Sequence, residues 1–152
     1  MADNFRLDWK GEELKLTMQE NGAKIISMFA LTVEAEAKKE LRRGHGVKTG
    51  TLRRSIHTAL PGYDWGGDNV EAKKIKRKKG VGVIEGSPER GFQKIMPANS
   101  TRMTLEVGSG MGYAMAVHQG HGNFEGYHYL TNGLTKAQRK LNSIMLLYRV
   151  RS

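Results

Sequence analysis

A helical pattern of apolar residues runs from Gly11 to Arg43, early in a chain of 152 residues. Acidic residues open the pattern, basic residues close it and Gly44 follows as a stop, an order that suits the helix dipole. Such a helix would be roughly 45 to 50 Å long, whereas a compact domain of this size is roughly 40 Å across. We therefore expect it either to break at Asn21-Gly22 or to project from the body. The apolar positions recur at spacings of four and seven: Leu14, Met18, Ile25, Phe29, Val33, Ala37 and Leu41.

Shorter elements follow this helix. Thr49 can cap a turn of helix that ends at Ser55, and residues 56–60 then alternate as a strand. Strands are also expected within 81–86 and 102–110, and "YAMAVHQG" predicts two helical turns that Gly120 stops. A C-terminal helix is predicted over 131–150, with an apolar stripe of Leu134, Ala137, Leu141, Ile144 and Tyr148.

These elements predict an α+β fold in a single domain, 1–152. The long N-terminal helix and the C-terminal helix are expected to pack on a small, mainly antiparallel sheet. Nineteen glycines indicate long loops, and we expect loop excursions over 62–80 and 85–102. There is no cysteine, so disulfides and thiolate metal ligands are excluded and the chain must be held by packing or by assembly.

Positive charge dominates the composition. There are 25 Lys and Arg against 15 Asp and Glu, a formal net charge of +10, which attracts polyanions, membranes or acidic proteins. Six of these basic residues form a basic block within 73–79. This block could bind phosphates, with Tyr63 and Trp65 nearby to stack on bases, or it could be a solvated interaction arm. No apolar run approaches membrane-spanning length and the N-terminal segment has no apolar signal core, so a soluble protein made in the cytoplasm is expected. The basic block consists of Lys73, Lys74, Lys76, Arg77, Lys78 and Lys79.

Two local motifs could carry chemistry, but each lacks a required part. "GSGMG" at 108–112 stands between a strand and a helix, as a dinucleotide-binding turn does, yet the last fingerprint position falls on Tyr113. His118, His121 and His128 could bind zinc, yet Glu125 is the only carboxylate after Glu106. No nucleophile with a base and no paired carboxylates stand out. We therefore expect no enzyme, no cofactor and no metal site.

Three short motifs occur in order along the chain. They are Thr49, Gly50, Leu52 and Ser55; then Val107, Gly108, Tyr113, Ala114, Val117 and Gly120; and then Tyr129 with Leu130. In the order and spacing of these motifs the chain, over residues 11 to 150, resembles the neck or tail-completion family of long-tailed bacteriophages, the proteins that help join a DNA-filled head to its tail. His118 stands where that family commonly has an acidic residue, and 62–80 and the region of Pro97 look like insertions.

The resemblance implies a non-enzymatic structural protein of the virion neck or tail, present in the host cytoplasm during assembly. It implies a homo-oligomeric ring, expected to be six-fold, around the DNA channel. The implied partners are further copies of the chain and other neck and tail proteins, namely a head-completion or adaptor protein and a tail terminator or tail tube. Genomic DNA would lie nearby in the channel, and no membrane is involved.

The segment "VKTGTLRRSI", 47–56, is interpreted as a folding corner. Gly50 permits a tight entry, Leu52 and Ile56 are expected inside, and Arg53 and Arg54 are expected outside as candidate contacts to an acidic neighbour. The basic block is also expected to contact an acidic protein partner, away from the channel. Strong binding to phosphates inside the channel would hinder the passage of the genome. A small basic nucleic-acid-binding protein remains the main alternative, and a metal-dependent enzyme centred on the histidines is a more distant one.

Overall fold

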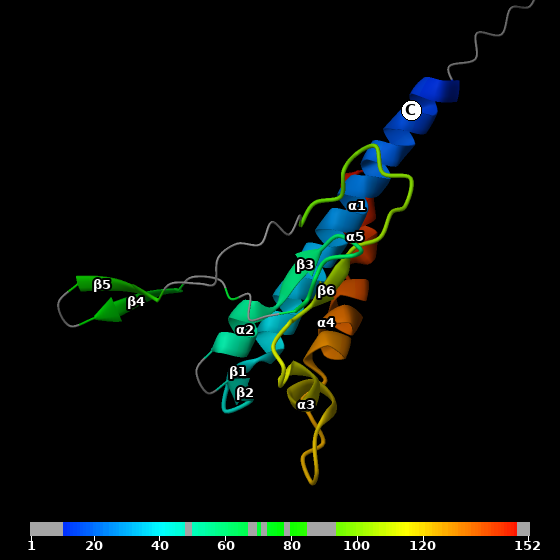
Figure 1. Ribbon diagram of the computed structural model, residues 1–152. Helices are drawn as coiled ribbons and strands as arrows, with labels where there is room; N and C mark the ends of the chain where they lie inside the picture. Colours follow the sequence, from blue (N-terminus) through cyan, green and yellow to red (C-terminus); the bar gives the residue numbers. More distant parts are fainter. Residues whose placement is uncertain are drawn as a thin grey trace, which may run out of the picture.

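The computed structural model describes residues 11–47, 50–66, 70, 73–77, 80–84 and 94–148. These residues form an α+β fold, as predicted, in which helices run alongside small two-stranded sheets (Figure 1). The elements in chain order are α1 (Gly11–Glu40), β1 (Arg42–Arg43), β2 (Gly46–Val47), α2 (Thr51–Ser55), β3 (His57–Ala59), β4 (Lys73–Arg77), β5 (Gly80–Ile84), β6 (Glu106–Gly108), α3 (Ala114–Gln119), α4 (Tyr129–Gln138) and α5 (Leu141–Leu147).

Helix α1 is unbroken. Of the two outcomes expected for it, a break at Asn21-Gly22 or projection from the body, the second is observed. The helix passes through Asn21-Gly22 without interruption, and the first buried residue along it is Ala23. The first turns of α1 extend beyond the other elements in Figure 1, and the residues before Ala23, 11–22, are called the α1 tip below. The predicted C-terminal limit at Arg43 is wrong, because the chain leaves the helix after Glu40 and Arg42–Arg43 pair in parallel with Gly46–Val47.

Among the described helices, α1 and α4 form the most extensive contact. A Cβ atom on Gly133 would lie 2.7 Å from the backbone nitrogen of Ala37, so the two backbones approach as only glycine allows. Ion pairs flank this contact, with Lys136 bonded to Glu40 and Lys140 Nζ lying 2.7 Å from Glu36 Oε1. Small residues at the crossing and opposite charges beside it together set the distance between the helices.

The predicted C-terminal helix over 131–150 is two helices. The first begins at Tyr129, and the break falls at Arg139 and Lys140 between α4 and α5. At the break the Lys140 amide donates to the Ala137 carbonyl at 2.9 Å, three residues back instead of four, which tightens the last turn and redirects the chain. Ala137 and Ile144 of the predicted apolar stripe are buried, but Leu134 is 40% exposed.

In the described part of the chain, the strands form three separate pairs instead of one small sheet. β3 and β6 are antiparallel, with Thr58 opposite Val107, and every residue of β3 is buried. β1 and β2 form a short parallel pair near the end of α1. This arrangement leaves α1 and α4 as the largest packed surface, with the β3–β6 pair beside them (Figure 1).

Four of the six basic residues of the block lie in a strand, which corrects their prediction as a loop. Residues 73–77 form β4, which pairs antiparallel with β5 in the register Lys73 with Ile84 and Arg77 with Gly80. The resulting ribbon stands away from the helices in Figure 1. The strand predicted within 81–86 is therefore present as β5, while Lys78 and Lys79 lie outside the described residues.

The segment 94–105 has neither helix nor strand, yet it is fastened along α1. The Met96 amide donates to Ser27 Oγ at 2.7 Å, and Lys94 Nζ lies 3.4 Å from Glu34 Oε1. Further along, the Met103 side chain occupies the space beside Gly22, where a Cβ atom would lie 2.7 Å from its sulfur. This irregular segment is thus held by side-chain contacts to the helix.

Candidate functional site

The residues that carry the family resemblance meet in one core. Leu52, Ala114 and Tyr129 are buried in the same cluster as Ala37 and Leu41 of α1. Partly buried members of the second and third motifs pack against it: Val107, Val117 and Leu130. Stretches that are distant in the sequence therefore converge on the C-terminal half of α1. Their shared position in one buried cluster indicates that they help to specify the fold.

Hydrogen bonds join the first two motifs. Ser55 Oγ donates to the Leu52 carbonyl at 2.8 Å and lies 2.6 Å from Ser109 Oγ. Ser109 Oγ also accepts the Met111 amide at 3.3 Å. The glycine-rich segment 108–112 is thus tied into the fold, and the strands beside it are antiparallel, unlike the parallel βαβ unit that dinucleotide binding requires.

The start of α2 differs from its prediction. Gly50 occupies the N-cap position with a left-handed φ of 81°, and no side chain caps the helix. The predicted cap, Thr49, lies outside the described residues. Arg53 is exposed as predicted, but Arg54 is half-buried, so only the first of the two arginines faces fully outward.

Glycines shape the loop between α3 and α4. The Tyr127 and His128 amides donate to the Val117 and His118 carbonyls at 3.0 and 2.9 Å, which folds the loop back on itself. Gly120 has a φ of 100°, and a Cβ atom there would lie 2.1 Å from the Phe124 carbonyl oxygen. The glycine in this motif is therefore required by the backbone path.

The three histidines near this loop have structural contacts. His118 Nδ1 accepts the Leu130 amide at 3.4 Å, and its ring packs edge-on against Tyr129 at 5.0 Å. Burial is the largest cause that lowers the His118 pKa below its usual value, and His128 adds to it. Within the described residues, no three His, Cys, Asp or Glu side chains are grouped so that they could hold a metal ion.

The aromatic residues suggested for base stacking pack on the protein itself. The Trp65 ring stacks on His57 at 4.7 Å, and Tyr63 lies edge-on to both. Trp65 Nε1 donates to Glu106 Oε2 at 3.0 Å. Burial lowers the pKa of His57, which favours a neutral ring in this stack. Tyr63 and Trp65 therefore both pack against other residues of the protein, beside the β3–β6 pair.

Two buried carboxylates on α1 were not predicted. Thr58 Oγ1 and Lys38 Nζ both donate to Glu34 at 2.8 Å, which joins β3 to α1. Glu36 receives Lys39 at 2.8 Å and Lys140 at 2.7 Å. The signal available in the sequence was that Glu34 is adjacent to the apolar Val33 and Glu36 is adjacent to the apolar Ala37.

Hydrogen bonds from Lys140 and then Lys39 lower the pKa of Glu36 from 4.5 to about 2. A carboxyl group with a lowered folded-state pKa stabilises the fold above its unfolded pKa and loses that contribution as the pH falls towards the folded value. We therefore expect Glu36→Gln to lower the free energy of unfolding at pH 7 by about 1 to 2 kcal/mol, because both lysines are partly exposed.

The difference between the wild-type chain and Glu36→Gln should shrink between about pH 4.5 and 2. Urea unfolding at a series of pH values measures it. Glu12→Gln is the control, since Glu12 is exposed and its nearest lysine nitrogen is 3.8 Å away. An equal difference at pH 7 and pH 2.5 would contradict the role of the Glu36 charge.

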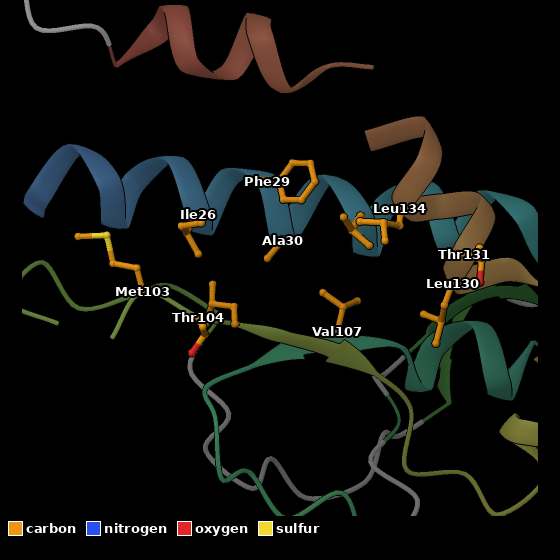
Figure 2. Close-up of a pocket in the computed structure, with 11 residues that line it drawn as sticks. Ile26, Phe29, Ala30, Met103, Thr104, Val107, Leu130, Thr131 and Leu134 are labelled. Carbon is orange, nitrogen blue, oxygen red and sulfur yellow. The ribbon is translucent and has the colours of Figure 1, made fainter. Parts of the chain in front are cut away.

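An apolar groove of about 480 Å³ lies between α1, the segment 103–107 and α4. Figure 2 shows Ile26 and Phe29 of α1 above it, Met103 and Val107 on the opposite wall, and Leu130 and Leu134 at the α4 end. None of the sequence motifs indicated this groove, because its walls come from three distant stretches.

Many large apolar side chains are exposed elsewhere on the surface. They include side chains of the α1 tip and of α5, with Leu147 72% exposed. Apolar surface of this kind marks contact sites when it is gathered instead of scattered. The exposed large apolar residues on the α1 tip, α4 and α5 are Leu14, Leu16, Met18, Leu134, Met145, Leu146 and Leu147.

A scan against protein-family models, a search of curated proteins and a search of solved structures each find no match. Across the described part of the chain, every helix is too short or too polar to cross a lipid bilayer.

Proposed function

We propose that the chain is a structural subunit of the neck or tail of a long-tailed bacteriophage, which works without catalysis as a homo-oligomeric ring around the DNA channel. The observation that carries this proposal is the packing of the family-like motifs, whose members from three separate stretches share one core. A motif that builds a fold suits a protein whose task is to hold a shape. The proposed site of action is the virion, reached from the host cytoplasm during assembly.

The apolar surface supports self-assembly. The α1 tip, the groove and α5 all leave large apolar side chains in contact with water. A subunit of a ring buries two lateral faces against its neighbours, and its axial faces meet other proteins. In the proposed function these axial partners are a head-completion or adaptor protein on one side and a tail terminator or tail tube on the other.

The basic block is proposed to be an arm for an acidic partner. β4 carries basic residues at four of its five positions, and β5 carries no charge. Lys74 is exposed, and the ribbon stands away from the body in Figure 1. Such a ribbon can reach a neighbouring protein without disturbing the core.

The proposed function is tested by counting copies in purified phage particles that carry the chain. Native mass spectrometry of their isolated necks should find a closed multimer, and electron microscopy should show its density as a ring at the head–tail junction. A single copy per particle, or absence from the particle, would exclude the proposal.

Binding to nucleic acid is the second candidate function, favoured by the strand conformation of the basic block. The major groove of DNA admits a two-stranded β-ribbon. Under this alternative the isolated monomer binds duplex DNA, and its affinity falls steeply with salt. The ring proposal expects no such binding by the monomer at physiological salt.

A further inference from the structure

We propose that the β4–β5 ribbon of one copy adds to the open edge of β6 in the next copy, so that two pairs of strands become one four-stranded sheet between subunits. In this sheet β5 lies beside β6, and the basic strand β4 lies at the outer edge. The inference rests on the proposed self-assembly and names the two surfaces that would make it. Rings with more than two subunits need such a contact between two different surfaces of the same chain.

The first surface is the edge of β6. Among the described strands β6 pairs with β3 alone, so its other edge has no strand to bond. Every residue of β3 is buried, whereas Glu106 of β6 is exposed and Val107 and Gly108 are half-buried. The accessible edge of this strand pair is therefore that of β6.

Two hollows follow this edge. Residues 103–105 and Val107 line the apolar groove, as Figure 2 shows for Met103, Thr104 and Val107, and residues 106–109 line a second hollow of about 330 Å³. Successive residues of an extended segment point to opposite faces, so hollows lined by successive residues lie along the edge of the backbone. No residue of β3 lines either hollow. Both hollows therefore lie on the side of β6 that faces away from β3.

An extended segment suits this edge better than a helix does. A helix bonds its own backbone groups, so α1 or α5 in the hollows would leave the edge of β6 unpaired. Residues 103–109 offer about 23 Å of edge, and the five residues of β5 need about 17 Å. Each described strand outside the ribbon has only two or three residues. The ribbon is thus the part of the described chain with strands long enough to cover the edge.

The second surface is the β5 side of the ribbon. Within the described residues the extensive contacts of β4 and β5 are with each other, and a two-stranded ribbon alone is marginally stable in water. Basic residues at four of the five positions of β4 discourage strand addition at its own edge, whereas β5, "GVGVI", carries no charge. Strand β5 is therefore the one that would pair with β6.

The charge of the hollows is compatible with this ribbon. Among the described residues that line them, none is lysine or arginine, and Glu106 is the one carboxylate. The basic strand would lie one strand spacing, about 4.8 Å, beyond β5. It would meet no like charge in the hollows and would keep its own edge free for the acidic partner proposed above.

The ribbon and the hollows belong to opposite sides of the subunit. In Figure 1 the ribbon lies to the left of α1, and α4, which forms one wall of the groove, lies to its right. The ribbon therefore points away from the groove of its own copy. A contact from one side of a subunit to the opposite side of the next repeats from copy to copy and can close a ring. We accordingly assign the edge to the ribbon of a second copy.

Hydrogen exchange tests the addition of a strand. When the wild-type chain assembles, backbone amides in both 80–84 and 103–108 should exchange several-fold more slowly than in the dilute monomer, because new strand hydrogen bonds protect them. Mass spectrometry of peptides that cover these two segments measures the change. Protection of 103–108 without protection of 80–84 would mean that another segment covers the edge, and would overturn the proposal.

Cross-linking of single-cysteine variants tests which copy supplies the ribbon, because the chain has no cysteine of its own. Val83→Cys and Thr104→Cys are treated with a short bifunctional maleimide, alone and mixed, and the mixture should cross-link several-fold more than either variant alone. Thr135→Cys replaces Thr104→Cys in the control, since Thr135 is exposed on α4 but outside the groove lining. In a chain that carries both Val83→Cys and Thr104→Cys, cross-links confined to one chain would overturn the assignment to a second copy.

A pair of glutamate variants tests the same contact by disruption. Val83→Glu changes the ribbon and Leu134→Glu changes a 40% exposed residue of the groove, so circular dichroism should remain that of the wild-type chain. Each variant alone should lose oligomers in analytical ultracentrifugation, whereas Thr135→Glu should keep them. Mixed together, the two variants retain one intact ribbon and one intact groove, and should form 1:1 dimers and nothing larger.

Oligomers that survive both glutamates, or a wild-type chain that stays monomeric, would overturn the strand addition. The copy number in particles, measured separately, would still decide the ring.

Discussion

Replacing Gly133 with valine is expected to unfold the chain by forcing α1 and α4 apart. Any Cβ atom at this position would lie within 3 Å of three Ala37 atoms, two of them in the backbone. Backbone atoms cannot move aside as the end of a flexible side chain can, so we expect a loss of about 3 kcal/mol or more. Thermal unfolding followed by circular dichroism measures this loss.

Alanine at the same position separates packing from helix propensity. Gly to Ala in a helix normally stabilises by about 1 kcal/mol, so any loss from Gly133→Ala reports the steric clash. Gly112→Ala, in the turn before α3, is the control for adding a Cβ atom without a clash, because nothing lies within 4 Å of a Cβ atom there, and its effect should be within about 0.5 kcal/mol. Wild-type stability of Gly133→Ala would mean that the two helices cross at a greater distance.

Leu52→Asp is expected to cost about 4 kcal/mol or more. Leu52 is 4% exposed and belongs to the core cluster that includes Ile56 and Tyr129. The substitution removes apolar contacts and places a carboxylate where no partner is available in the cluster. Urea unfolding should show either a large shift of the midpoint or a chain that is unfolded without denaturant.

The neighbouring arginine provides the comparison for this prediction. Arg53 is exposed on the same short helix, so Arg53→Ala should change stability by less than about 1 kcal/mol. Equal losses of melting temperature for the two variants would show that the inward and outward sides of α2 had been exchanged.

Periodicity predicted the parts of the fold in which one face is buried over many residues. It gave α1 from its first residue, because apolar positions at spacings of four and seven share a face, although Leu14 and Met18 at the start of that face are exposed. It also placed Leu52 and Ile56 inside. These two residues are four positions apart and so lie on the same side of the short helix and its end. Local patterns thus identified the elements and much of the core.

Features that depend on distant partners were not predictable in this way. The basic block was interpreted as a loop from its charge, but backbone hydrogen bonds to β5 allow a strand whatever its side chains are. Lys140, at the break between α4 and α5, pairs with Glu36 of α1, which lies 104 residues earlier, and no local pattern indicates that contact. The groove has no local signature either, because three separate segments form its walls.

The contact between Ala37 and Gly133 also affects how the chain is made. The two residues are 96 positions apart (133 − 37), so the ribosome completes the α1 sequence long before it reaches its partner. At about 5 to 20 residues per second, the interval is roughly 5 to 20 s. During that time the apolar face of the nascent helix is open to chaperones and to other nascent chains. The fold can close only when α4 emerges from the exit tunnel, so translation speed over this interval sets how long the unfinished chain is exposed.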